Sequence, residues 1–518
     1  MSSTPSVEGH IERVVVAGLK RPGKRAIGVL SVDRVVASVV LLTLLLSVFR
    51  INQYPAPWFD EGIHLQVAKN LAADGTYAAR SADNTLDYAP VIGVGPTLLL
   101  PIAAVFELTG PSLAGGRSIP IIYLILATAL LFVVSRSLFG QPAAFVTLAV
   151  LLAMPALDWI ETGRQVLGEV PALAFLLAGG LLVQRSMSRQ ALIAGGIVLG
   201  LSLVTKGQYV LIVPATLIAL AFVDLRWTRH RNLAWHATLF CTVVGTWAGW
   251  MTSLLLVIGE GDALHNIRLL RESSSGALLV LEPSRMTAAW KVVLGPGAIF
   301  IVVPAAIAGL VALRSAEGER RFAILAIWLF QAAWLGWFVT ASIGWPRYVF
   351  AGLAINAIFA GYLIDRLQAQ ARAVVSDRTR SGSALAAAAC VGFSLLLVAG
   401  GWRTLSPVVT SDEQDASHFA ALLHSRIPKG ATVNAWEPEL SFLSDVAIQP
   451  PPPGSLSDVV NARWYGGQMP DFSRDLDGEF LVIGPFARWV GVYDGAAASS
   501  NWRQIESVGS YQLFQRLD

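Results

Sequence analysis

Long apolar segments constrain this chain more strongly than any other feature. A helix needs roughly 20 apolar residues to cross about 30 Å of hydrocarbon, and fewer where neighbouring helices cover its ends. Eleven windows of the 518-residue sequence meet this criterion. They lie at about 31–50, 117–138, 141–157, 169–184, 190–204, 207–224, 234–258, 291–313, 321–341, 347–365 and 383–402. We therefore expect a polytopic α-helical membrane protein with about 11 transmembrane helices.

The composition supports a membrane protein and excludes other classes. Hydrophobic residues make up 54% of the chain and charged residues only 14%, against about 25% charged in soluble proteins. The net charge of +3 indicates no nucleic-acid partner, because membrane proteins gather Lys and Arg on one side for topological reasons. Cys241 and Cys390 both lie inside apolar windows, so no disulfide framework or thiolate metal site is expected in an exported part.

The segment 93–109 is a twelfth candidate span, but it is short and interrupted by Pro96 and Pro101. If it does not span, every loop assigned to the cytoplasm carries arginine, as the positive-inside rule requires. We therefore expect an interfacial or re-entrant piece of one long outer loop, 51–116, and a cytoplasmic tail at 1–30. The arginines counted are Arg136, Arg185, Arg189, Arg226, Arg229, Arg231, Arg314, Arg320, Arg321, Arg366, Arg372, Arg378 and Arg380.

Composition changes after the last apolar window. Residues 403–518 contain no spanning segment, many Asp, Glu and Ser, and a PPPPG break at 450–454. A helix is expected near 411–426, with Ser411 as a candidate N-cap, and strands at 431–436, 479–484 and 511–516. The chain thus divides into the tail, a transmembrane domain at 31–402, and a small α/β extracytoplasmic domain at 403–518.

Two cations lie on the outer side, where short loops should be poor in positive charge. Lys206 falls in the tight turn of LSLVTKGQYVL, and Arg347 opens a span in SIGWPRYVF. Either one alone could reach lipid headgroups or pair with a nearby carboxylate. Together, beside acidic loops, they indicate a phosphate site, because Arg offers a planar fork of donors and Lys a point charge.

The acidic residues of the outer side occur in two loops. The stretch PWFDEGIHLQVAKNLAADG (57–75) contains Asp60 and Glu61, and DWIETGRQVLGEVPALAF contains Glu169 ahead of an apolar helix. On local grounds Asp60 is the N-cap of a helix from Glu61 to about 73, closed by Gly75. Glu169 also fits a first-turn carboxylate that the helix dipole favours. His64 either orients Asp60 or is an interfacial histidine.

Four segments together resemble the GT-C membrane glycosyltransferases that use polyprenyl-phosphate sugars. The similar branch contains the protein O-mannosyltransferases and the lipid A aminoarabinose transferases. The resemblance implies a GT-C fold and a polyprenyl-phosphate-linked sugar as donor. It also implies transfer to a protein, lipid or glycan at the outer face of the plasma membrane. The segments are FDEGIHLQVAKNLAADGTY, ETGRQVLGEVPALAF, GLSLVTKGQYVLIVP and PRYVFAGLAINAIFAGYLI.

The resemblance also implies roles for individual residues. Asp60 would be the general base, supported by Glu61, and Glu169 would orient the acceptor, bind a metal or position Arg164. The donor phosphate would be held by Lys206 and Arg347, with Arg164 as a further cation. Inversion at the anomeric carbon follows, no cofactor is required, and a divalent metal ion is left open. The supporting residues would be His64, Tyr88 and Tyr348.

Departures from the family limit the assignment. Aminoarabinose transferases carry a lysine and two prolines after the first-loop helix, where this chain has Asp87-Tyr88-Ala89-Pro90-Val91. Phe59 stands where the mannosyltransferases have a histidine. Donor and acceptor therefore cannot be copied from either group. The alternative function is a transporter or lipid carrier, but that class places ionisable residues near the bilayer midplane, and the windows here are nearly free of charge.

Overall fold

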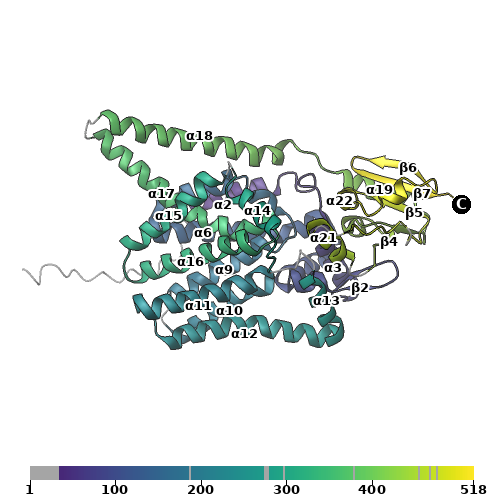
Figure 1. Ribbon diagram of the computed structural model, residues 1–518, viewed down its shortest axis with the longest axis horizontal. Helices are drawn as coiled ribbons and strands as arrows, with labels where there is room; N and C mark the ends of the chain where they lie inside the picture. The colour runs from purple at the N-terminus through teal and green to yellow at the C-terminus, as the bar shows by residue number, and fades with distance from the viewer. Residues whose placement is uncertain are drawn as a thin grey trace, which may run out of the picture.

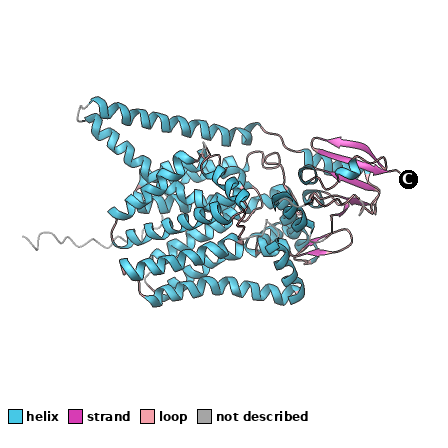
Figure 2. Ribbon diagram, in the orientation of Figure 1, coloured by secondary structure: helices cyan, strands magenta, loops and turns pink. Residues whose placement is uncertain are grey.

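The computed structural model combines a helical bundle with a mixed α/β domain at one end (Figures 1 and 2). It describes residues 34–517, except 186–187, 273–278, 296–297, 377–379, 453–454, 466–467 and 474–475. The tail at 1–30 and the end of the PPPPG break fall outside the described residues.

A helix occupies each of the eleven apolar windows. Six helical segments of the described chain are long and apolar enough to cross a membrane on their own, so the number of eleven spans remains a prediction. The central helix is α17, whose apolar window is 89% buried in the bundle. The bundle helices are α2 (Arg34–Val48), α6 (Leu113–Phe139), α7 (Gln141–Ala153), α9 (Glu169–Arg185), α10 (Arg189–Thr205), α11 (Gln208–Val223) with η1 (Asp224–Thr228), α12 (Leu233–Ile258), α15 (Ile299–Ser315), α16 (Gly318–Ala341), α17 (Phe350–Ser376) and α18 (Arg380–Thr410).

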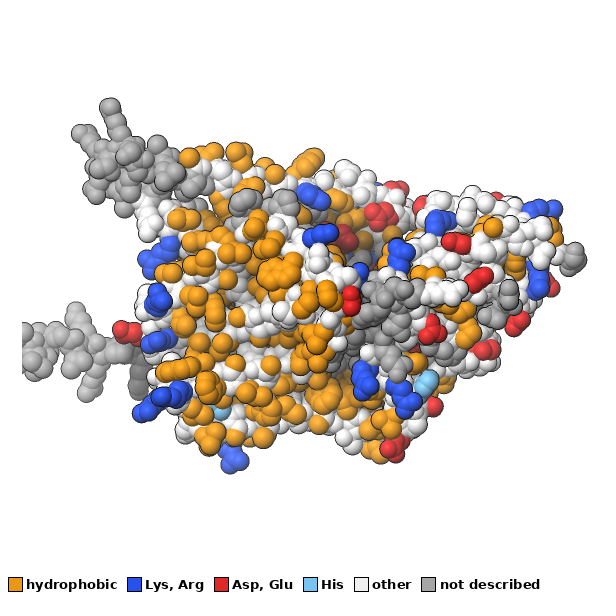
Figure 3. All heavy atoms as spheres, viewed as in Figure 1, with side chains coloured by type: hydrophobic (Ala, Val, Ile, Leu, Met, Phe, Trp, Pro, Cys, Tyr) orange, Lys and Arg blue, Asp and Glu red, His pale blue; other side chains and the backbone are white. Residues whose placement is uncertain are grey.

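The surface of the bundle has the charge distribution of a membrane domain. Apolar side chains cover the side of the bundle seen in Figure 3, and Lys and Arg side chains gather at the end that lies away from the α/β domain. Arg226 and Arg229, at the junction of α11 and α12, are exposed. An apolar belt with a basic end is typical of a multi-pass membrane protein.

The segment 93–109 forms α5 (Pro96–Thr109), a helix of 14 residues that contains Pro101. Its entry is fixed by an antiparallel bridge between Val94 and Lys206. The Gly95 N–H donates to Thr205 O at 3.2 Å, and a Cβ on Gly95 would lie 1.9 Å from Val204 O. The first outer loop therefore holds the turn that carries Lys206, and only glycine allows so close an approach.

Short elements on the side of the α/β domain complete the outer loops. Those of the first loop are α3 (Phe59–Asp74), β1 (Ala79–Arg80), β2 (Leu86–Asp87) and α4 (Ala89–Gly93). Those of the later loops are α8 (Trp159–Arg164), α13 (Glu260–Glu272), α14 (Pro283–Val293) and η2 (Pro346–Val349).

The C-terminal region forms a five-stranded sheet in the order β4-β3-β5-β7-β6. β3 is parallel to β4 and β5, whereas β7 is antiparallel to β5 and β6. The expectation of Ser411 as an N-cap is wrong, because α18 continues to Thr410 and the next helix begins only at Asp415. The elements are α19 (Asp415–Arg426), β3 (Thr432–Asn434), α20 (Pro438–Leu443), β4 (Ala447–Gln449), α21 (Ser455–Tyr465), β5 (Phe480–Ile483), α22 (Pro485–Val490), α23 (Asp494–Ala497), β6 (Trp502–Val508) and β7 (Tyr511–Arg516).

The C-terminal domain packs directly on α3. The Phe59 ring stacks on Phe486 with ring centroids 3.9 Å apart and meets Trp436 edge-on at 6.2 Å. One turn later, Gly62 faces the backbone of α20, where a Cβ would lie 2.2 Å from Glu439 N. Aromatic pairs add stability beyond the area that they bury. The first turn of α3 is thus fixed by residues that follow it by more than 370 positions.

We predict that Gly62→Ala destabilises the folded protein by about 1–3 kcal/mol, because the new methyl group would overpack the contact between α3 and α20. In an exposed helix the same change stabilises by roughly 1 kcal/mol. The control is Gly245→Ala in α12, where a Cβ has nothing within 4 Å. Thermal unfolding in detergent should show a lower Tm for the first variant alone. A Gly62→Ala protein as stable as the control variant would contradict this packing.

Candidate active site

The helix α3 carries the two adjacent carboxylates. It begins at Phe59, after an extended Trp58 (φ −117°, ψ 160°), and ends at Gly75 in the left-handed conformation (φ 76°), whose N–H donates to Leu71 O. The prediction that α3 ends at Gly75 is confirmed. The prediction that Asp60 is its N-cap is wrong, because the N-cap is Trp58. Asp60 lies within the first turn, and its carboxylate turns to a residue of another element instead of to the free N–H groups of α3.

That residue is Arg347, in the short helix η2. Arg347 Nη1 donates to Asp60 Oδ2 at 2.5 Å, and their side chains are only 18% and 19% exposed. The guanidinium also lies over the rings of Trp345 and Tyr348 at 4.8 and 5.4 Å. Burial opposes ionisation of Asp60, but the charges of Arg347 and Lys206 outweigh it and hold the pKa of Asp60 below its usual 3.8. Asp60 is therefore a carboxylate at neutral pH.

A second ion pair joins Glu169 and Lys206. Glu169 is the first residue of α9 and Lys206 lies in the turn between α10 and α11, with Glu169 Oε1 3.1 Å from Lys206 Nζ. Both residues are buried. The lysine side chain passes Gly168, where a Cβ would come within 2.8 Å of Lys206 Cδ. A role for Glu169 as a first-turn carboxylate alone does not account for this buried pair.

Three of these four charged residues line one pocket. Glu169, Lys206 and Arg347 share it with Gln208, Tyr209, Trp334, Tyr348 and Ala351. Asp60 borders it through its bond to Arg347. The structure thus brings together residues from the two acidic loops and the two outer cations that the positive-inside rule singled out. A pocket with two cations and one carboxylate, with the Asp60 carboxylate bonded to one of the cations, can bind a phosphate and hold a base beside it.

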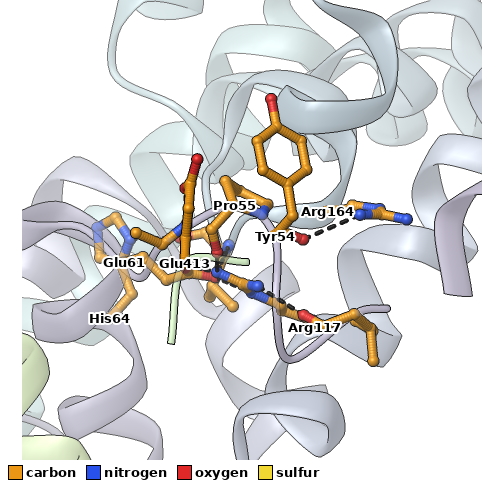
Figure 4. A network of polar contacts seen from close by, with 10 residues as sticks. Tyr54, Pro55, Glu61, His64, Arg117, Arg164 and Glu413 are labelled. Atoms are coloured by element: carbon orange, nitrogen blue, oxygen red, sulfur yellow. Dashed lines mark hydrogen bonds and ion pairs between the residues drawn. The ribbon is translucent and has the colours of Figure 1, made fainter. Parts of the chain in front are cut away.

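Glu61 does not line this pocket and belongs to a buried network, which Figure 4 shows. Arg117 Nε and Nη2 donate to its two carboxylate oxygens at 2.9 and 2.7 Å, and Val166 N–H donates at 3.1 Å. Arg117 also donates to the carbonyls of Ile51 and Pro55. Arg117 is fully buried, as is Glu61. Glu61 therefore anchors α3 to α6 and to the loop before α9.

His64 belongs to the same network. Its Nδ1 lies 2.6 Å from Val166 O, so Nδ1 carries the proton that it donates to this carbonyl. Burial lowers the pKa of His64 to about 4, and the imidazole is neutral at pH 7. This contact ties α3 to the second outer loop, next to the bond from Val166 N–H to Glu61.

Arg164 and Tyr88 lie apart from the pocket. Arg164 donates to the carbonyls of Leu46, Phe49 and Tyr54, which follow or end α2, and Figure 4 shows it directed at Tyr54. Its guanidinium is thus occupied by backbone acceptors and does not join Lys206 and Arg347. Tyr88 packs in the apolar cluster of α3, α4 and α12. Tyr348 lines the pocket and accepts from Trp334 Nε1 through its carbonyl at 2.8 Å.

Arg117, Gln208 and Trp334 were not foreseen as site residues. Arg117 had a usable signal, because it is a cation at the outer end of an apolar window, the same criterion that identified Lys206 and Arg347. Gln208 and Trp334 carry no such signal. Among the described residues, no group of three or more His, Cys, Asp or Glu side chains has the arrangement of a metal site.

Comparisons with known proteins bear on the fold. Residues 94–250, which include Glu169 and Lys206, match the family model "Dolichyl-phosphate-mannose-protein mannosyltransferase". The structure is similar to ArnT from Cupriavidus metallidurans bound to undecaprenyl phosphate, with a TM-score of 0.61 and 13% identity, covering 93% of this chain and 97% of that one. The chain has the GT-C fold. A search of curated protein sequences gives no match.

A second solved GT-C structure extends the comparison. The archaeal oligosaccharyltransferase AglB from Archaeoglobus fulgidus, in complex with an inhibitory peptide and a dolichol-phosphate, gives a TM-score of 0.54 at 11% identity. The match covers 86% of this chain and 69% of AglB. The resemblance to GT-C glycosyltransferases of polyprenyl-phosphate sugars, predicted from four sequence segments, is thereby confirmed.

The buried pair of Glu61 and Arg117 predicts an unequal response to mutation. Arg117→Met should destabilise the protein by about 3–5 kcal/mol, because it leaves the Glu61 carboxylate buried without a cation. The double variant Glu61→Gln/Arg117→Met should recover much of this loss, since a neutral amide can still accept from Val166 N–H. Unfolding in detergent measures both. Equal losses of unfolding free energy in the single and double variants would show that Arg117 does not stabilise the buried charge of Glu61.

Proposed function

We propose that the protein is an inverting glycosyltransferase that moves a single sugar from a polyprenyl-phosphate donor to an acceptor hydroxyl at the outer face of the plasma membrane. The observation that carries the proposal is the ion pair of Asp60 and Arg347 beside a pocket that contains a second cation, Lys206. In this proposal Asp60 is the base and Arg347 and Lys206 are the two phosphate ligands, at the end of the bundle where the α/β domain packs.

The two cations suit a lipid phosphate as the leaving group. The planar guanidinium of Arg347 can bind two phosphate oxygens, while the Lys206 ammonium supplies a compact charge. Breaking the bond between the anomeric carbon and the phosphate oxygen adds negative charge to that phosphate. Because the two cations stabilise this charge, no separate catalytic acid is needed. ArnT in complex with undecaprenyl phosphate has the same fold, which supports this choice of ligand.

In this mechanism, binding of the donor phosphate to Arg347 frees the Asp60 carboxylate to act as the base. In the structure Arg347 is bonded to Asp60, so a donor phosphate that binds Arg347 competes with that carboxylate. Loss of the arginine contact removes one cause of the lowered Asp60 pKa and makes Asp60 a stronger base. Asp60 then takes the proton of the acceptor hydroxyl as its oxygen attacks the anomeric carbon. The polyprenyl phosphate departs from the opposite face with the bonding electrons.

The remaining predicted residues support this chemistry at a distance from the reacting atoms. Glu169 holds Lys206 in place through their ion pair, and Glu61 and His64 fix the first turns of α3. Tyr348 flanks Arg347. Arg164 braces the end of α2, and Tyr88 precedes α4, which leads to the bridge with Lys206.

We predict that Asp60→Asn lowers the rate of sugar transfer by about 10²–10⁴-fold, the usual contribution of a general base. It should bind undecaprenyl phosphate at least as tightly as the wild type, because Arg347 loses its internal partner. Transfer from undecaprenyl-phosphate hexoses and pentoses, and equilibrium binding of undecaprenyl phosphate, measure the two effects.

The control is Asp445→Asn, which removes a carboxylate whose side chain is 83% exposed and which pairs with Lys69 outside the pocket. This variant should keep wild-type transfer. An Asp60→Asn enzyme with wild-type turnover would exclude Asp60 as the base.

A further inference from the structure

The pocket extends beyond Glu169, Lys206 and Arg347 to a wall that the proposed mechanism leaves unused. This wall consists of Gln208, the first residue of α11, together with Tyr209 and Trp334. Gln208 is only 7% exposed, Tyr209 1% and Trp334 3%. A phosphate held by Arg347 and Lys206 would be adjacent to these side chains, because all five line the same pocket.

The polar atoms of this pocket fall into two chemical kinds. Arg347 and Lys206 offer donors. Gln208 Oε1 and the carboxylate oxygens of Glu169 are buried acceptors that receive no hydrogen bond from the described part of the chain, although Lys206 pairs electrostatically with Glu169. A buried acceptor without a donor is costly. A phosphate supplies only acceptors, whereas a ligand with hydroxyl groups supplies the donors that Gln208 lacks.

The aromatic part of the wall has an apolar character. Trp334 Nε1 already donates to Tyr348 O at 2.8 Å, so its N–H is not available to a ligand. Tyr209 meets the Trp334 ring at 4.7 Å between centroids and an interplanar angle of 64°. Ligand pockets commonly combine such apolar walls with a few polar groups that fix orientation. The C–H face of a sugar ring can pack against this aromatic wall. A hydroxyl group at the edge of the same ring can donate to the amide oxygen of Gln208.

We propose that Gln208 and the Tyr209–Trp334 wall bind the glycosyl group of the donor, with Gln208 Oε1 accepting a hydrogen bond from a hydroxyl of the sugar. This assignment rests on the proposed function, in which Arg347 and Lys206 hold the phosphate of the same molecule. Gln208 is thereby a specificity residue for the sugar, separate from the residues that recognise lipid phosphate.

The test is Gln208→Met, which keeps the length and packing of the side chain and removes its amide. The kcat/KM for transfer from an undecaprenyl-phosphate hexose should fall about 10- to 100-fold, as expected when a sugar hydroxyl loses its buried partner. Binding of undecaprenyl phosphate, which has no sugar, should stay within about twofold of the wild type. Lys206→Met should instead weaken binding of both ligands.

A matched control is Gln331→Met, the same substitution at a buried glutamine of α16 that does not line the pocket. It should leave kcat/KM unchanged. If Gln208→Met does not fold, Gln208→Asn, which withdraws the amide by one methylene, should give the same separation between donor turnover and lipid-phosphate binding.

Unchanged transfer by Gln208→Met, or an equal loss of donor turnover and undecaprenyl-phosphate binding, would overturn the assignment of Gln208. Either result together with an inactive Asp60→Asn enzyme would leave the proposed glycosyl transfer standing and remove only the sugar subsite. Absence of transfer by the wild-type protein from every undecaprenyl-phosphate hexose and pentose would contradict the proposed function itself.

Discussion

The contact between Asp60 and Arg347 joins the two halves of the site. Asp60 belongs to the first outer loop and Arg347 to the segment that opens α17, 287 residues later. A partly buried ion pair stabilises only when its geometry is good and its charges are well solvated by neighbouring groups. Here the arginine lies over two aromatic rings and the carboxylate lies in the first turn of a helix, where the dipole favours negative charge.

The rest of the outer architecture keeps α3 in the position that this contact requires. On one side Glu61 binds Arg117 of α6, and on the other Phe59 and Gly62 pack against the C-terminal domain. The bridge between Val94 and Lys206 positions the second cation from the same loop. A base must be held in one geometry to work efficiently, and these contacts supply that constraint from three separate parts of the chain.

Periodicity and charge were sufficient to predict the helical bundle and the two outer cations. Apolar windows fall on helices, and the positive-inside rule selected Lys206 and Arg347, which line one pocket. The same rule applied to Arg117 would have found the partner of Glu61. Rules based on neighbouring residues alone failed where a side chain distant in the sequence determines the contact that a residue makes. The N-cap preference misassigned Asp60, because an arginine far along the chain takes its carboxylate.

Arg164 illustrates the same limit. Its sequence position near Glu169 suggested a phosphate ligand, but its donors reach carbonyls 110 to 118 positions away. The place of Gln208 and Trp334 in the pocket could not be predicted either, because an apolar window does not indicate which of its side chains face a pocket.

The central claim is that the donor phosphate takes Arg347 from Asp60. A cryo-EM structure of the protein with undecaprenyl phosphate in lipid nanodiscs tests it directly. The claim predicts a phosphate oxygen within hydrogen-bond distance of Arg347, with the guanidinium more than about 4 Å from the Asp60 carboxylate, beyond ion-pair range. A bound lipid phosphate next to an Asp60–Arg347 contact that still measures 2.5 Å would contradict it.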